Sequence, residues 1–147
     1  MNTTDATYID PERDRFKMMF GLPLDAPVHM INLLRFRDVA AYAPDDPEAG
    51  GPAVSGAAAY ARYAAEAGPH FRAVGGEQLW AGTPELMVIG PLDKQWDSAF
   101  IAAYPTAQAF IDMLRNPDYQ HATRHRRAAL LDSRLIRTRP VDGSGHF

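Results

Sequence analysis

The sequence predicts an α+β protein of the ferredoxin-like split βαβ class, with a four-stranded antiparallel sheet and helices on one face. Two observations predict this fold. The expected order of elements is strand, helix, two strands, two helices and strand, which is the order of that topology. The two most apolar strands come first and third, where the topology places its central pair, and the more polar strands fall at the edges.

The first strand is Val28–Phe36, the longest apolar run in the chain. Because side chains alternate along a strand, Met30, Asn32 and Leu34 lie on one face and Ile31 lies on the other. Both faces are largely apolar, which predicts a strand that is covered on both sides.

The bulk composition is that of one soluble globular domain, with 147 residues, 46% of them hydrophobic and 22% charged. A formal net charge of −3 argues against general electrostatic binding to nucleic acid or to acidic membranes. No cysteine is present, which excludes disulfides and thiolate chemistry. The chain shows no signal peptide and no run of roughly 20 apolar residues. We therefore expect a cytoplasmic protein without nucleic-acid or membrane partners.

Three segments divide the chain. Residues 1–26 form an N-terminal arm, 27–140 the ferredoxin-like domain, and 141–147 a loose tail. Within the arm, Asp10-Pro11-Glu12 begins a short helix, because Asp can cap free N–H groups and Pro is tolerated in the first turn. Gly21 ends that helix. We expect the arm to pack outside the main fold.

A loop and a helix follow the first strand. Residues 38–55 are rich in Pro, Gly and Asp and predict a long loop, either a lid over a binding site or a mobile surface insertion. Ser55 caps a helix that runs to about Val74. Gly68-Pro69 should bend or break this helix. Its apolar stripe, which faces the sheet, consists of Tyr60, Tyr63, Ala67, Phe71 and Val74.

The second half of the domain begins with two short extended pieces, residues 78–81 and 86–89, which Pro84 marks as an edge of the sheet. The second strongly apolar strand is Trp96–Tyr104, and it should lie beside the first. The parity of this strand leaves open which face Trp96 occupies.

Two helices and a strand complete the domain. Thr106 can cap the first helix, and Asn116-Pro117-Asp118 begins the second with cap, proline and acid in their preferred places. The last strand is Ser133–Arg139, whose flanking charges suit a protected edge.

The predicted helices cover only one face of the sheet, so apolar side chains of the central strands would contact water in a monomer. We therefore predict a symmetric homodimer in which two sheets pack face to face.

Several short motifs resemble a known family. They are Asn-Leu-Leu-Arg-Phe-Arg at 32–37, Ser-Gly-x-x-x-Tyr-x-x-Tyr from Ser55, Gly-Gly-x-x-x-Trp from Gly75, Trp-Asp at 96–97, Tyr-Pro-Thr at 104–106 and Asp-Ser-Arg-Leu-Ile at 132–136. Together they resemble domain-of-unknown-function family 1330, over roughly residues 27 to 140. The resemblance implies a dimeric α/β barrel of ferredoxin-like subunits. It implies no reaction and no catalytic residues.

Asn32 is the first candidate site residue, because an amide between Met30 and Leu34 costs free energy unless its donors and acceptor find partners. Its partner can be backbone or buried water, or the amide can orient a ligand carbonyl or hydroxyl. Aromatic side chains that can line an apolar cleft beside it, or simply form core, are Tyr60, Tyr63, Trp80, Trp96 and Tyr104.

Histidines supply the candidates for proton transfer. His70 follows Pro69 and can act as a general base if the bent helix opens onto the cleft. His125 lies one helical turn after His121, but a third metal ligand is missing and arginines surround the pair, so we predict no metal. Those arginines form a solvated face or hold an anionic ligand.

Two functional hypotheses remain, neither of which requires a cofactor. One is a small enzyme, monooxygenase-like or isomerase-like, that acts on an apolar oxygenated molecule, with Asn32 polarising a carbonyl and His70 or His125 moving a proton. The other is a non-catalytic domain that binds such a molecule or serves only in assembly. The sequence names neither the ligand nor the reaction.

Overall fold

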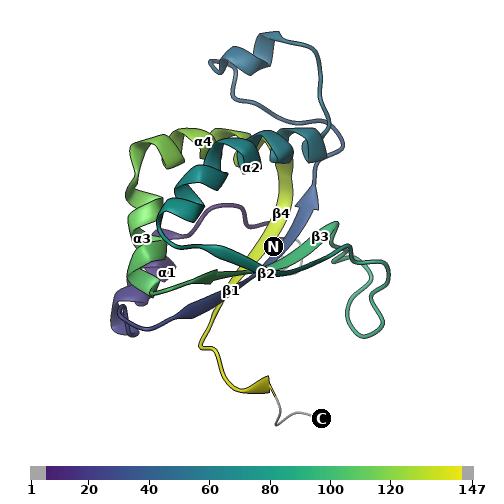
Figure 1. Ribbon diagram of the computed structural model, residues 1–147. Coiled ribbons are helices and arrows are strands. Elements are labelled where there is room, and N and C mark those ends of the chain that lie inside the picture. The colour runs from purple at the N-terminus through teal and green to yellow at the C-terminus, as the bar shows by residue number, and fades with distance from the viewer. Residues whose placement is uncertain (1–5, 144–147) are drawn as a thin grey trace.

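The computed structural model describes residues 6–143 and has the predicted ferredoxin-like topology (Figure 1). The four strands are β1 (Val28–Phe36), β2 (Glu77–Gly82), β3 (Ser98–Tyr104) and β4 (Leu130–Thr138). They form one antiparallel sheet in the order β2-β3-β1-β4. The predicted central pair and the two predicted edges are therefore confirmed.

The strand register separates the two faces of the sheet. Val28 pairs with Tyr104 and Met30 pairs with Ala102, and all four side chains are buried on the helix side. On the other face Ile31 is only partly buried. The sheet of a single chain is open and does not close into a barrel, so the barrel implied by the family resemblance would need a second copy.

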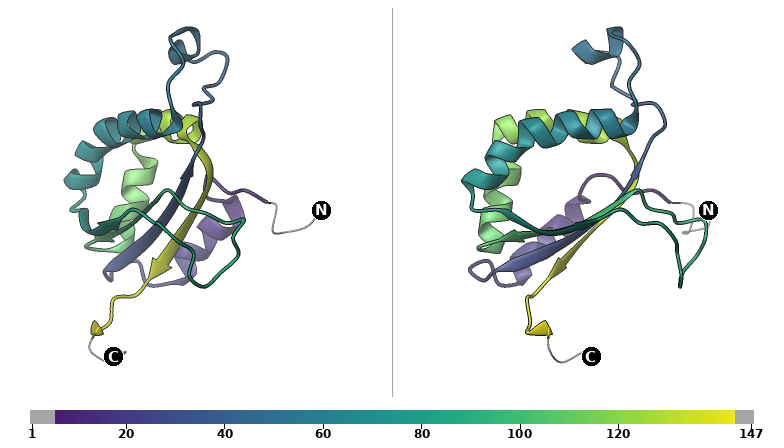
Figure 2. Two further views of the ribbon diagram at one scale, coloured as in Figure 1. Left: turned by 90° about the vertical axis from the view of Figure 1, so that its right-hand side faces the viewer. Right: turned by 45° about the vertical axis from the view of Figure 1, so that its right-hand side comes forward.

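Helices α2 (Gly56–Ala73), α3 (Ala107–Arg115) and α4 (Pro117–Ala129) lie together on one face of the sheet (Figure 2). The predicted caps of these three helices are confirmed, because each cap side chain accepts a hydrogen bond from a free N–H of the first turn. Ser55 Oγ accepts from Ala58 at 3.0 Å, and Thr106 Oγ1 accepts from Ala109 at 3.1 Å. Asn116 caps α4 in the same way. The predicted Asp10 cap of the arm helix is wrong, because that helix begins after Glu12, which makes no side-chain cap hydrogen bond.

Helix α2 does not break at Pro69. It runs without interruption to Ala73, and Figure 1 shows that its axis turns in its second half. The proline removes one helical hydrogen bond. Packing of Ala67 and Phe71 against the core on either side of Pro69 keeps the helix continuous.

The predicted strand at residues 86–89 is absent, and residues 83–97 form an irregular loop. Pro84, Pro91 and the positive φ of Gly90 (142°) interrupt extended structure there. Strand β3 consequently begins at Ser98 rather than at Trp96. Strand β4 begins at Leu130, earlier than predicted, because it continues directly from α4.

The arm joins the domain instead of packing outside it. Its helix α1 (Arg13–Met18) continues as the 3-10 turn η2 (Met19–Gly21), and Phe16 packs against the main buried cluster. Upstream, Tyr8 donates its N–H to Asp132 of β4 at 2.9 Å and accepts a hydrogen bond from Ser133 Oγ at 2.7 Å. The arm is thus hydrogen-bonded to side chains of the edge strand β4.

Two parts of the predicted boundaries lie outside the described residues, namely 1–5 of the arm and 144–147 of the tail. Within the described part of the chain, no helix is long and apolar enough to cross a membrane.

Candidate functional site

The core is divided at Asn32. Met30 belongs to one buried cluster and Leu34 to a second, and Asn32 lies between them on the helix side of β1. Its Nδ2 donates a hydrogen bond to the backbone oxygen of Met30 at 3.1 Å. Within residues 6–143 no hydrogen bond engages its Oδ1. The amide is therefore only half satisfied by the protein.

Four tyrosines, here called the tyrosine cluster, pack in or against these two buried clusters; they are Tyr60, Tyr63, Tyr104 and Tyr119. The ring centroids of Tyr60 and Tyr63 are 5.2 Å apart, and those of Tyr63 and Tyr119 are 6.2 Å apart. The hydroxyls of Tyr63 and Tyr119 form a hydrogen bond of 2.7 Å. Helices α2 and α4 are therefore joined at the tyrosine cluster by both ring packing and a hydrogen bond.

Burial raises the pKa of each of the four hydroxyls above the ordinary tyrosine value. For Tyr60 and Tyr104 the neighbouring hydroxyls raise the pKa further, whereas Arg126 lowers the pKa of Tyr60. All four hydroxyls consequently stay protonated at neutral pH and can donate hydrogen bonds.

Two of these hydroxyls have no protein partner. Within the part of the chain that the structure describes, Tyr60 Oη and Tyr104 Oη form no hydrogen bond. Neither oxygen is completely buried without a partner; among the described side chains, that is found for Arg37 Nε. Buried polar groups are nearly always satisfied, by water if not by protein. The interior thus presents Asn32 Oδ1 as an acceptor and two hydroxyls that can donate or accept.

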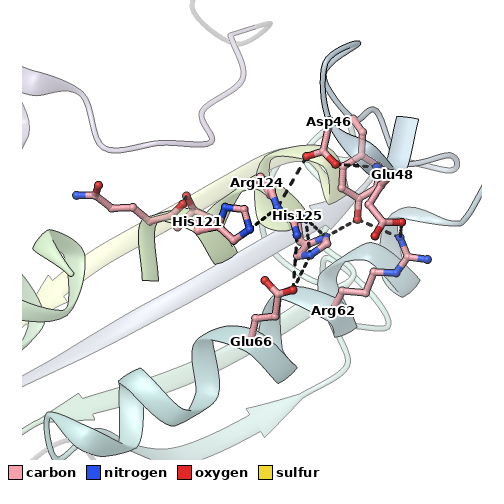
Figure 3. Close-up of polar contacts among 10 residues, drawn as sticks. Asp46, Glu48, Arg62, Glu66, His121, Arg124 and His125 are labelled. Carbon is pink, nitrogen blue, oxygen red and sulfur yellow. Dashed lines mark hydrogen bonds and ion pairs between the residues drawn. The ribbon is translucent and has the colours of Figure 1, made fainter. Parts of the chain in front are cut away.

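His125 forms a separate polar network beneath the 38–55 loop (Figure 3). Its side chain is 2% exposed. Nδ1 lies 2.6 Å from Tyr42 Oη, and Nε2 lies 2.7 Å from Arg124 Nη1 and 3.2 Å from Glu66 Oε1. Nε2 thus faces a guanidinium, which can only donate, and a carboxylate, which can only accept, while Nδ1 faces a hydroxyl that can do either.

Ion pairs extend this network to the loop. Arg62 of α2 donates to Tyr42 Oη at 3.3 Å and to Glu48 at 3.1 Å. Arg124 of α4 lies 3.9 Å from Asp46. Glu48 belongs to the 3-10 turn η3 (Pro47–Gly50). The network therefore ties the 38–55 loop to both helices, and we call it the loop latch; its members are Tyr42, Asp46, Glu48, Arg62, Glu66, Arg124 and His125.

The predicted proton-transfer histidines differ in their availability. Both ring nitrogens of His125 have protein partners in the loop latch. His70 is half-buried on α2, where its Nδ1 lies 3.5 Å from Asn116 Nδ2, and its Nε2 has no partner within residues 6–143. Of the two, His70 is the more available for proton transfer.

The two predicted tryptophans are separated from the tyrosines by the sheet. Trp80 pairs with Ile101 on the face away from the helices and is 54% exposed. Trp96 lies on the same side as Leu33, and the two line a groove with a volume of about 300 Å³. The aromatic residues predicted to form one wall therefore belong to two different sites.

Sequence reasoning did not single out Tyr42 and Tyr119 as site residues. Tyr119, Ala122 and Arg126 share one face of α4. This helical spacing could have indicated that Tyr119 faces the interior. Nothing local marks Tyr42, because the partners of its hydroxyl, His125 and Arg62, are 83 and 20 positions away in the chain.

His121 and His125 do not form a metal site with other groups. Arg124 Nε donates to His121 Nε2 at 3.3 Å. Among residues 6–143, no group of three or more His, Cys, Asp or Glu side chains could hold a metal ion.

Comparison with known proteins places the chain next to uncharacterised relatives. The family model described as "Domain of unknown function (DUF1330)" matches residues 52–138, which is more than half of the chain. Two solved structures are each 44% identical to this chain and cover 93% of it. They are a methylated RPA0582 protein, with a TM-score of 0.85 and 97% of its own chain covered, and RPA0582 of Rhodopseudomonas palustris, a protein of unknown function, with a TM-score of 0.84 and 99% covered.

A more distant structure is that of a dimeric protein of unknown function with a ferredoxin-like fold from Bacteroides fragilis. It is 11% identical to this chain, covers 80% of it and 99% of its own chain, and has a TM-score of 0.47. The comparison with curated proteins found no match.

Proposed function

Because this chain belongs to the DUF1330 family, whose description names no activity, we propose its function from the geometry of the interior. The proposal is that the protein binds a small, apolar, oxygenated organic molecule between sheet and helices, beside Asn32. One observation carries it. Asn32 Oδ1, Tyr60 Oη and Tyr104 Oη have no partner within residues 6–143, although apolar clusters surround them.

The arrangement matches the general chemistry of small-molecule sites, in which mostly apolar walls carry a few placed polar groups. Protonated hydroxyls donate well to carbonyl and ether oxygens, and the amide oxygen accepts from a ligand hydroxyl. Burial disfavours a charged ligand at this position. An apolar molecule with one or two oxygen atoms therefore fits better than a polar or ionic one.

A metabolite thermal-shift screen tests the proposal. We expect oxygenated apolar compounds to raise the melting temperature of the wild-type protein, because a ligand that binds only the folded state stabilises it. In Tyr60→Phe and Asn32→Ala the shift should fall by more than half. The matched control is Tyr8→Phe, which removes a hydroxyl from the arm. A wild-type protein that no compound stabilises, or shifts that persist in both site variants, would contradict binding at this place.

A second candidate is a cofactor-free enzyme that uses the same site. It is favoured by His70, whose Nε2 is unpartnered within the described residues and which lies two helical turns from Tyr63 on α2. In this proposal Asn32 Nδ2 polarises a carbonyl with the N–H that it does not donate to Met30, and His70 moves a proton. Product analysis on each thermal-shift hit tests it. Turnover that is lost in His70→Gln and Asn32→Ala while binding persists supports the enzyme, and stabilisation without product supports the binder.

We also propose that the protein is a homodimer through the sheet face opposite the helices. On that face Trp80 is 54% exposed and Ile136 is 47% exposed, and Ile31 and Ile101 between them are half-buried. Water contact with such a patch is unfavourable, and a second copy can cover it. Light scattering at micromolar concentration should give twice the mass of the 16.2 kDa chain. A mass of one chain would contradict the proposal.

A further inference from the structure

The 83–97 loop carries the most exposed apolar side chains on the sheet face opposite the helices. It projects from that face (Figure 2). Val88 is 81% exposed and Ile89 is 92% exposed, while Leu86 and Leu92 are 74% and 70% exposed. Single exposed apolar residues are ordinary, but four within seven positions form a patch that marks an interaction site.

The loop is built to present these side chains. Met87 is half-buried and turns back toward Gly90, where an added Cβ would lie 2.6 Å from its Sδ. Gly90 also has a φ of 142°, which disfavours any side chain there. At the base of the loop, Gln95 Nε2 donates to the backbone oxygen of Leu92 at 2.9 Å. The turn at Gly90 therefore leaves the side chains of residues 88–89 exposed to solvent.

Beside the loop lies the groove of about 300 Å³, lined mainly by apolar side chains; its residues are Leu33, Pro84, Glu85, Leu86, Met87, Gln95 and Trp96. The Trp96 wall is held in place by Arg134, whose guanidinium lies 5.2 Å from the tryptophan ring centroid and 5.0 Å from that of Tyr8. The groove and the projecting residues lie on one face of one chain.

We infer that the occupant of this groove is a second copy of the chain, and that each copy inserts Val88 and Ile89 into the groove of the other. The inference rests on the proposed homodimer and names the contact that completes it. In a two-fold symmetric interface both copies use the same face. The projecting residues of each copy can therefore enter the groove of the other.

The apolar area also fits a stable pair. Together Trp80, Ile136 and the four exposed loop residues expose on the order of 800 Å² of side chain, which is about what each partner buries in a standard interface. The groove is continuous with the sheet face through Leu33. A small-molecule ligand would leave Val88 and Ile89 in water, whereas a second copy covers both features at once.

Cysteine crosslinking tests the contact directly, because the chain contains no cysteine. Ile89→Cys and Gln95→Cys would be co-expressed on full chains with different tags and oxidised. We expect a disulfide-linked heterodimer, because the two positions would meet across the interface. The matched control pairs Ile89→Cys with Ala65→Cys, an exposed position on α2, and should give no heterodimer.

The outcomes separate this inference from the proposed dimer. A dimeric mass in light scattering without the Ile89–Gln95 crosslink would overturn the loop insertion and leave the sheet-face dimer standing. A monomeric mass would overturn both. Ile89→Asp supplies a second measurement, in which we expect the dimer dissociation constant to rise at least tenfold. An unchanged constant would likewise overturn the insertion.

Discussion

Asp132 is a carboxylate held almost entirely inside the protein, with 3% of its surface exposed. Burial by itself raises its pKa, but hydrogen bonds from the Tyr8 N–H, from Arg134 at 2.7 Å and from the Ser133 N–H outweigh that effect and lower it. Lys94 Nζ lies 3.6 Å away. This single residue therefore connects the arm, the edge strand and the 83–97 loop.

The lowered pKa makes Asp132 a source of pH-dependent stability. A carboxyl whose folded pKa lies below its unfolded value of about 3.9 stabilises the fold above that value. This stability is lost as the pH falls through the folded pKa. We expect Asp132→Asn to lose about 2 kcal/mol at pH 7 and to show a smaller further loss below pH ~4 than the wild-type protein does.

Urea unfolding at several pH values measures this effect, and Asp112→Asn, an exposed carboxylate on α3, is the control. Equal free energies of unfolding for Asp132→Asn and the control at pH 7 would contradict the role assigned to Asp132.

Gly56 shows how one missing side chain permits a close approach of backbones. An added Cβ there would lie 2.2 Å from the backbone oxygen of Arg37 and 2.7 Å from that of Ala129. Because backbone atoms cannot move aside cheaply, Gly56→Ala should lower the free energy of unfolding by about 3 kcal/mol. Thermal unfolding checks this, with Gly50→Ala as the control because an added Cβ there meets nothing within 4 Å. Similar melting temperatures for the two variants would refute the explanation.

At the scale of elements, the 38–55 loop is held by the loop latch as well as by backbone hydrogen bonds. Its backbone reaches α4 through Ala41 N–H to Ala128 O at 2.9 Å, whereas Ala40 N–H to Val54 O, also at 2.9 Å, joins the two ends of the loop. The side-chain connection runs from Tyr42 to the buried imidazole of His125. Helices α2 and α4 therefore determine where the loop lies.

Removing the Tyr42 hydroxyl should loosen this loop selectively. In Tyr42→Phe we expect amide hydrogen exchange within residues 40–54 to be at least fivefold faster, because the buried hydrogen bond to His125 and the contact with Arg62 are both lost. Exchange in β1 and β3 should be unchanged. Asp45→Asn, an exposed position in the same loop, is the control. Unaltered exchange at residues 40–54 in Tyr42→Phe would show that the latch does not hold the loop.

The elements themselves differ in how well local sequence predicts them. Strand β1 matches its predicted bounds, and Ser55, Thr106 and Asn116 act as caps, because apolar alternation and cap chemistry are local signals. Residues 86–89 have strand-forming side chains but no neighbouring strand to pair with, so the prediction there is wrong.

At the scale of the whole molecule, one sheet face is covered and the other is bare. The helices cover Val28 and Met30, whereas Ile136 on the opposite face is 47% exposed. A charge at Ile136 would be desolvated in a sheet-face dimer and would remain hydrated in a monomer. A charged residue at position 136 therefore tests whether the sheet-face dimer forms, and the test needs no ligand.

Ile136→Asp should raise the dimer dissociation constant at least tenfold, without lowering the monomer's melting temperature by more than a few degrees. Analytical ultracentrifugation measures the constant. The control is Val39→Asp, a position that is 60% exposed at the start of the 38–55 loop, away from the sheet face. The same dissociation constant in both variants would contradict a sheet-face dimer.

The candidate site could be predicted only in part. Asn32 stands out in sequence because an amide interrupts an apolar run, and Tyr60 and Tyr63 follow from helical spacing. Their meeting with Tyr119, and the separation of Trp96 from them, could not be predicted. These depend on how α4 crosses α2 and on the path of an irregular loop, and no local pattern encodes either.

By itself the sequence determined the order of the elements, the central pair of strands and the two faces of β1, because alternation and capping act between neighbours in the chain. The tertiary structure alone decided that His125 is held by Tyr42 and that Trp96 lies behind the sheet. These contacts join residues far apart in the chain, and their geometry follows from packing the whole molecule rather than from any one segment.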